Sequence, residues 1–140
     1  MSAVDALQAA LAGEHACIWG YGVVGGNLTG DEADAARAAL GTHRARRTPL
    51  AEQLRLREAE PVAALAAYEL PYPVADAAAA RDLATLLEQR LAGIYADLIG
   101  LTNLGGVRRL ATTALAESAR LAAHWSGDVT ALPGIDPAPE

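Results

Sequence analysis

The chain has 140 residues, of which 52% are hydrophobic, so it is long enough for one globular domain with a single core. Its formal net charge of −6 argues against nucleic acid as the main partner, because nucleic-acid-binding proteins concentrate positive charge on one surface. No window is apolar enough for a membrane span, no signal peptide is evident, and the single cysteine excludes an internal disulfide. We therefore expect a cytoplasmic protein with no membrane or nucleic-acid partner.

Alanine and leucine dominate the chain and phenylalanine is absent, a composition that favours helix throughout. Gly25-Gly26-Asn27 ends the first helix, and acidic residues around Asp31 suit the positive N-terminal end of the second. Pro49 lies inside the second helix, where we expect a kink or an adjusted turn. In chain order, the expected helices span about residues 3–25, 29–57, 74–101 and 104–125.

The segment 59–73 contains three prolines and is predicted to connect the second and third helices without forming a core helix. At roughly 3.3 Å per residue it is long enough to run the length of a bundle. The other connections are short, so the helices they join are antiparallel neighbours. The sequence therefore predicts an all-α, up-down four-helix bundle over residues 1–127 with one long crossover, the ferritin-like topology. Residues 128–140 are expected to form an extended or disordered tail.

Positions spaced alternately three and four apart give the face of each helix that would point into the bundle. On the second helix this series is Ala36, Leu40, His43, Arg47, Leu50 and Leu54. On the fourth helix it is Val107, Leu110, Ala114, Glu117, Leu121 and His124. Each of the four helices then places one polar residue near the middle of its inward face, namely Glu14, His43, Glu88 and Glu117.

A carboxylate in a core is costly unless it is paired, hydrogen-bonded or bound to a metal. Arg47 and Arg120 are candidate cations for an ion-pair cluster, and the hydroxyl of Tyr95 could hydrogen-bond to it. The residues alone leave an ion-pair cluster and a metal site open.

The runs Ala6–Ala16 and Tyr21–Gly25, followed by His43-Arg44-Ala45-Arg46-Arg47, resemble an actinobacterial ferritin-like domain of unassigned function. Further matching stretches lie at 67–71 and 87–95, and the resemblance extends nearly to Trp125. It implies a ferritin-like four-helix fold.

Ferritin-like di-iron proteins use a glutamate from each of two helices and a Glu-x-x-His motif from each of the other two. Carried over by position, Glu14 and Glu88 match the two lone glutamates. The second helix keeps His43 but has Leu40 in place of the glutamate, and the fourth keeps Glu117 but has Arg120 in place of the histidine. The resemblance therefore implies a degenerate metal site.

Two functions remain open from the sequence, and it does not decide whether the protein is an enzyme. The first is a non-catalytic binding or structural module, with no cofactor expected and an arginine beside the core carboxylates. The alternative is a metal-binding oxidoreductase or metal-storage protein, with iron or manganese in a mononuclear or di-iron site. Its candidate ligands are Glu14, His43, Glu88 and Glu117.

Two surface features complete the expectations. The arginines of the 43–47 run are predicted either to bind an anion or to form a solvated helix face. Glycines at 20, 22, 25 and 26 indicate a tightly packed surface on the first helix, and we expect this surface or the tail to support a homodimer.

Overall fold

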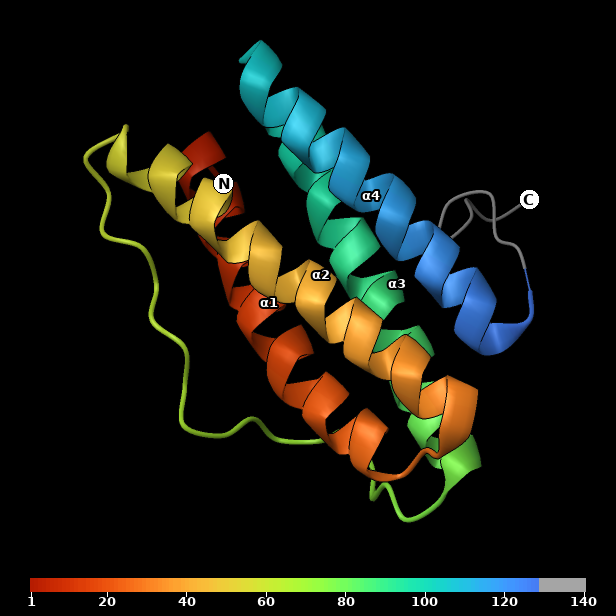
Figure 1. Ribbon diagram of the computed structural model, residues 1–140. Coiled ribbons are helices and arrows are strands. Elements are labelled where there is room, and N and C mark those ends of the chain that lie inside the picture. Colours follow the sequence, from red (N-terminus) through yellow and green to blue (C-terminus); the bar gives the residue numbers. More distant parts are fainter. Residues whose placement is uncertain (129–140) are drawn as a thin grey trace.

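The structure, a computed structural model, describes residues 1–128 and contains four α-helices and no strand within that range. The helices are α1 (Ala3–Gly26), α2 (Gly30–Arg55), α3 (Ala77–Leu101) and α4 (Gly105–Ser126) (Figure 1). The prediction of an all-α four-helix protein is confirmed. Beyond Asp128, the predicted tail lies outside the described residues. No helix in residues 1–128 combines the length and the apolar character that a bilayer crossing requires.

Side-chain caps set the starts of two helices. At α1, the Ser2 hydroxyl accepts a hydrogen bond from the Asp5 amide at 3.1 Å, and the Ser2 amide donates to the Asp5 carboxylate at 2.8 Å. This reciprocal pair is a capping box. At α3, Asp76 accepts from the amide of Ala79 at 2.8 Å. The Asp76 cap explains why α3 begins at Ala77 and not at the predicted residue 74.

The C-terminal end of α2 is formed by the backbone. Pro49 does not interrupt the helix, which continues to Arg55. The amide of Ala59 then donates to the carbonyl of Leu54 at 3.0 Å, and the amide of Glu58 donates to that of Arg55 at 2.9 Å. This is the Schellman arrangement, and it places Glu58 in the left-handed region with φ of 56°.

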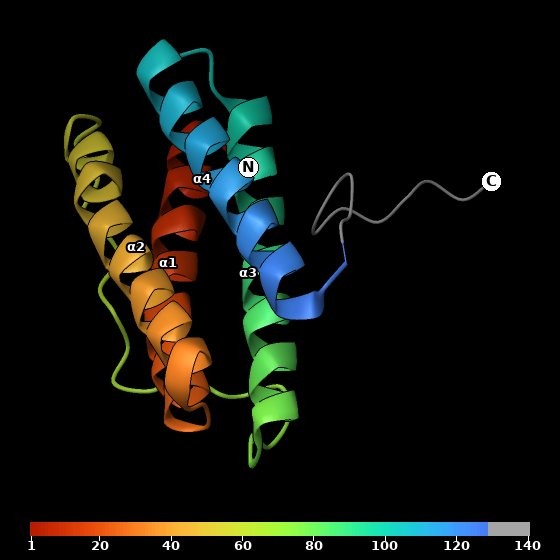
Figure 2. The same cartoon turned by 45° about the vertical axis from the view of Figure 1, so that its right-hand side comes forward.

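The helices pack unevenly around the bundle. Helix α1 packs against both α2 and α3, and α3 packs against α4, whereas α2 and α4 make little backbone contact. Figure 2 shows α1 between α2 and α3. Two apolar clusters fill the interior, one containing Leu7, Leu50 and Leu98 and the other containing Val24 and Leu83. The polar residues described below lie between these clusters.

Only part of the predicted glycine surface is tightly packed. A Cβ atom on Gly20 would lie 2.5 Å from Cδ1 of Leu87 on α3, so Gly20 allows close approach within this chain. Gly22 and Gly26 have open space around them. The close contact is therefore between helices of one chain, and the homodimer stays a prediction.

The crossover between α2 and α3 is attached to one face of α1. The side-chain amide of Gln8 donates to the carbonyl of Glu60 at 2.7 Å and accepts from the amide of Val62 at 2.9 Å. Nε2 of His15 lies 3.0 Å from the carbonyl of Val62. Gln8 and His15 are seven residues apart, which places them on the same side of the helix. His15 therefore points away from the core residue Glu14 and holds the crossover.

Candidate functional site

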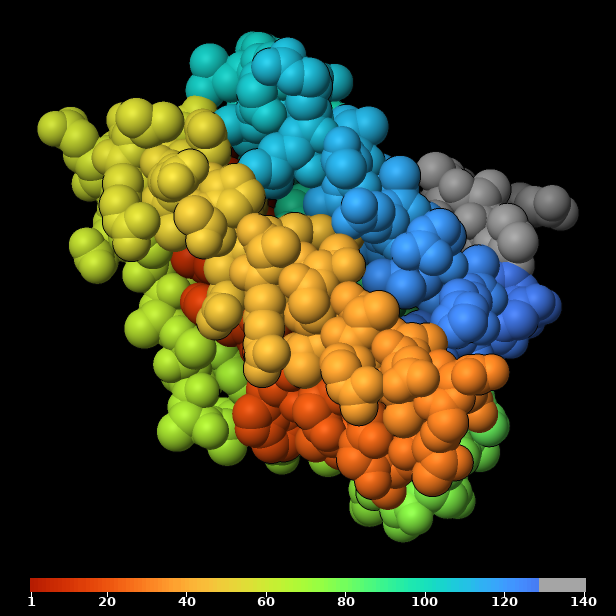
Figure 3. All heavy atoms as spheres, viewed as in Figure 1, coloured from red at the N-terminus to blue at the C-terminus, as the bar shows by residue number. Residues whose placement is uncertain are grey.

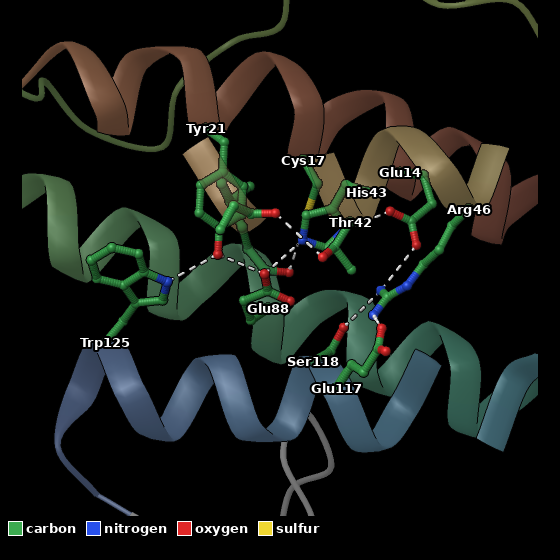
Figure 4. Close-up of polar contacts among 12 residues, drawn as sticks. Glu14, Cys17, Tyr21, Thr42, His43, Arg46, Glu88, Glu117, Ser118 and Trp125 are labelled. Atoms are coloured by element: carbon green, nitrogen blue, oxygen red, sulfur yellow. Dashed lines mark hydrogen bonds and ion pairs between the residues drawn. The ribbon is translucent and has the colours of Figure 1, made fainter. Parts of the chain in front are cut away.

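A buried histidine joins two buried glutamates at the centre of the bundle. Nδ1 of His43 lies 2.6 Å from Oε2 of Glu14, and its Nε2 lies 2.7 Å from Oε1 of Glu88 (Figure 4). All three side chains have no exposed surface. They come from α2, α1 and α3 respectively. Three of the four polar residues predicted to face the core, Glu14, His43 and Glu88, therefore meet there.

The geometry and the neighbouring negative charge both favour a doubly protonated ring at His43. Carboxylate oxygens lie at both ring nitrogens, and an imidazole satisfies two acceptors only when both nitrogens carry hydrogen. Burial alone would lower the pKa of His43. The hydrogen bonds to Glu14 and Glu88, together with their negative charge, outweigh burial and raise that pKa to about 9. His43 is therefore an imidazolium at neutral pH.

Two tyrosines also donate hydrogen bonds to the buried carboxylates. Tyr95 on α3 donates to Oε1 of Glu14 at 2.5 Å, and Tyr21 on α1 donates to Oε1 of Glu88 at 2.6 Å. Each tyrosine follows the glutamate of its own helix by seven residues. Its hydroxyl, however, donates to the glutamate of the other helix. Burial, followed by the charge of the partner carboxylate, raises the pKa of both phenols above its usual value. Both tyrosines therefore stay neutral hydrogen-bond donors, and Tyr21 also accepts from Nε1 of Trp125 at 3.0 Å.

Arg46 links α2 to α4 on the side where these helices make little backbone contact. Its Nη1 donates to Glu14 at 3.2 Å and to Oγ of Ser118 at 3.3 Å. Its Nη2 donates to Glu117 at 2.5 Å (Figure 4). Burial would lower the pKa of Arg46, but the charge of Glu14 and the hydrogen bond to Glu117 raise it above its usual value. The guanidinium therefore supplies a second buried positive charge.

The arginine in the cluster differs from the predicted one. Arg47 is half-buried and forms no ion pair with a described residue, and Arg120 is exposed. Glu117 takes part only through Arg46, and its side chain is 42% exposed. The predicted series on α2 ran through Leu40 and Arg47, whereas the buried series runs through Ala39 and Arg46. Both series share Ala36, His43 and Leu50, so the same three-and-four spacing permits either.

Sequence reasoning also missed Ser118 and the hydrogen bond between Trp125 and Tyr21. Small residues on α4 mark its inward face, since Ala111, Ala114 and Ser118 follow each other at spacings of three and four. This pattern would have identified Ser118 as a core residue.

The residues as arranged do not fit the metal site that the ferritin-like resemblance implies. A metal ligand must offer a lone pair, yet both nitrogens of His43 face carboxylates at hydrogen-bond distance. The guanidinium of Arg46 is hydrogen-bonded to one carboxylate oxygen of Glu14 and to one of Glu117. Within residues 1–128, no group of three or more His, Cys, Asp or Glu side chains is arranged to hold a metal ion. The ligand roles of Glu14, His43, Glu88 and Glu117 stay untested predictions.

Comparison with known proteins places this fold in a family. Residues 6–137 match a family described as a domain of unknown function, DUF4439. No curated protein matches the chain. The structure is similar to the crystal structure of the conserved hypothetical protein rv2844 from Mycobacterium tuberculosis, with 36% sequence identity and a TM-score of 0.86. That match covers 89% of this chain and 96% of the other. The chain therefore belongs to the DUF4439 family of helical domains of unknown function.

Proposed function

We propose that this domain is a non-catalytic helical binding or structural module whose centre is an ion-pair network. The observation that carries the proposal is the position of His43, with a carboxylate oxygen at each ring nitrogen. In a di-iron protein of similar helix arrangement, carboxylates and histidines hold the metal. Here, protonated side chains provide the positive charge that the carboxylates need.

The charges of the four buried acidic and basic residues in the network balance. The imidazolium of His43 and the guanidinium of Arg46 stand opposite the carboxylates of Glu14 and Glu88. A divalent metal would have to displace these hydrogen-bonded protons, because ligands must be deprotonated before a metal binds. The network therefore opposes metal binding near neutral pH.

The same network specifies how the helices associate. Glu14 on α1, His43 on α2 and Glu88 on α3 are joined directly, and Arg46 extends the network to Ser118 and Glu117 on α4. A buried polar network adds little net stability compared with an apolar core, but breaking one partner is costly. We infer that it fixes one register of the four helices and thereby holds the outer surfaces in position for binding.

One observation favours the alternative of a metal-binding oxidoreductase or storage protein. Oε2 of Glu88 is buried and has no hydrogen-bond partner among residues 1–128. Such an oxygen is an available donor for a hard cation such as iron or manganese. This alternative needs His43 to release at least one of its two protons.

Elemental analysis separates the two proposals. The protein would be expressed with iron, manganese and zinc supplied and purified without chelator, as wild type, Glu88→Gln and Glu52→Gln. Glu52 is exposed on α2 and serves as the matched control. We expect far less than one metal per chain in all three proteins. About one metal per chain that is lost in Glu88→Gln and retained in Glu52→Gln would overturn the proposed function.

A further inference from the structure

A pocket with three arginines lies on the outer side of α2, away from the ion-pair network. Its volume is about 360 Å³, and the crossover forms the wall opposite α2. In Figure 3, α1 (red) is visible at the bottom of this hollow, between α2 (yellow) and the crossover (yellow-green). The arginines are Arg44, Arg47 and Arg55. Arg47 and Arg55 follow Arg44 by three and eleven residues, and these spacings place all three on one face of α2.

The pocket holds an excess of positive charge. Glu60 is the one acidic residue in its described walls, against three arginines. None of these arginines forms an ion pair with a residue in 1–128, whereas Arg37 and Arg81 each pair with a carboxylate. The chain as a whole is acidic, with a net charge of −6. A concave surface with one sign of charge concentrates the opposite ion, so this pocket attracts anions.

The other walls of the pocket contain polar groups that have no partner. Nε2 of His15 donates to the carbonyl of Val62 on the crossover. On the crossover, the amide of Val62 donates to Gln8 and that of Leu65 donates to Tyr68. Between them, the amides of Ala63 and Ala64 make no hydrogen bond within the described residues, and both residues line the pocket. The crossover therefore contributes two lining residues whose backbone amides have no partner among residues 1–128, beside the arginines of α2.

We propose that this pocket binds a small phosphate-bearing molecule. Guanidinium groups match phosphate oxygens in charge and in their paired hydrogen-bond geometry. Unpaired backbone amides are a second common donor to phosphate. The volume lies in the range of small-molecule sites and leaves room beside the phosphate for a small organic group. This inference deepens the proposed binding role, because it assigns that role a site and a ligand class.

The pocket is distinguished from an ordinary solvated helix face by its second wall. Gln8 and His15 hold the crossover against α1, so Ala63 and Ala64 stand opposite the arginines of α2. A ligand in the hollow would contact residues of α2 on one side and of the crossover on the other. Arg90 on α3 is exposed and unpaired within residues 1–128, but it lies outside these walls. It provides a control with the same change of charge.

The test is isothermal titration calorimetry at constant ionic strength, with sn-glycerol 3-phosphate and with inorganic phosphate as the two ligands. The proteins are wild type, Arg47→Gln, Arg44→Gln and Arg90→Gln, each checked for an unchanged melting transition. We expect saturable binding of one ligand per chain, weakened about tenfold or more by Arg47→Gln or Arg44→Gln. Arg90→Gln should change the affinity less than about twofold.

Two results would overturn the inference. One is the absence of saturable binding of either probe up to about 10 mM. The other is an equal loss of affinity in Arg90→Gln and Arg47→Gln, which would mean that only overall charge matters. Stronger binding of glycerol 3-phosphate than of inorganic phosphate would support a phosphate ester, and equal binding would support recognition of the phosphate group alone. The metal analysis tests the ion-pair network, and the titration tests the phosphate site. Metal-free protein that does not bind phosphate would therefore reject this inference without contradicting the ion-pair network.

Discussion

Arg46 and Arg47 are neighbours of the same residue type, yet they belong to two different regions of the molecule. Arg46 is 8% exposed and donates to Glu14, Ser118 and Glu117 inside the bundle. Arg47 lines the outer pocket and pairs with no described carboxylate. Successive residues on a helix are separated by about 100°, which is enough to move a side chain from one region to the other. The angular position on α2 therefore decides what each arginine does.

The two regions also differ in how their charges are satisfied. In the inner network, His43 and Arg46 each have carboxylate partners and little or no contact with water. In the outer pocket, three arginines share one glutamate among the described walls. In the inner network each cation is paired with carboxylates, whereas the arginines of the outer pocket keep capacity for a ligand. Substitutions in the two regions test this contrast.

Removing His43 should have the largest effect. His43→Ala leaves Glu14 and Glu88 buried without the cation between them, and breaking a buried ion pair costs ~3–5 kcal/mol. Urea denaturation measures the loss of unfolding free energy, and His43→Gln provides a more conservative change if the alanine variant does not fold. A loss under about 1 kcal/mol in both variants would contradict the account.

The stability should also depend on pH through His43. Its pKa rises from the ordinary value of 6.5 to about 9 in the folded protein, so the folded state holds this proton more tightly. The contribution of this proton to the free energy of unfolding is therefore fully present below pH 6.5, and it is lost as the pH rises through about 9. The difference corresponds to about 3 kcal/mol. Denaturation curves across this pH range should show the loss in wild type and a much flatter profile in His43→Gln. An increase in stability between these pH values would count against an imidazolium.

Replacing the two neighbouring arginines should separate the regions. Arg46→Gln removes the contact to α4 and one partner of Glu14, which keeps His43 and Tyr95, so we expect a loss of about 2–3 kcal/mol. Arg47→Gln should stay within about 0.5 kcal/mol of wild type, because it breaks no described ion pair. Thermal and urea unfolding of both variants provide the comparison. Equal losses would mean that the assigned helix face is wrong.

The smallest expected effect concerns the backbone at the C-terminal end of α2. Glu58 occupies the left-handed region with φ of 56°, where glycine carries no steric penalty. Glu58→Gly should stabilise the protein by up to about 1 kcal/mol. Glu52→Gly, inside α2, should destabilise it by a similar amount. Melting curves of the two variants should shift in opposite directions, and a shift in the same direction would contradict the described end of α2.

Much of the fold could be predicted because its signals are local. Prolines marked the crossover and glycines marked the end of the first helix. The predicted helix boundaries agree with the structure to within a few residues, and the largest difference is at α3, where Asp76 caps the helix. Glu14, His43 and Glu88 were found because an isolated polar residue on an apolar face stands out at either spacing.

The helix phase could not be predicted as well, for a physical reason. On α4, the predicted series chose Leu110 and Glu117, but the structure buries Ala111 and Ser118. On α2 the series likewise chose Leu40 over Ala39. Hydrophobicity favours the leucines, whereas closely packed helices bury the smaller residues at their contacts. In an alanine-rich chain the larger side chain is a poor guide to the inward face, and the missed Arg46 and Ser118 follow from this.

The most direct test of the ion-pair network is the protonation state of His43 in metal-free protein. Nitrogen-15 chemical shifts of the imidazole, followed from about pH 5 to about pH 10, report both ring nitrogens. We predict that both carry hydrogen at neutral pH and that the ring titrates near pH 9. A neutral ring at pH 7, with one nitrogen unprotonated, would leave a lone pair for a metal and would contradict the network proposed here.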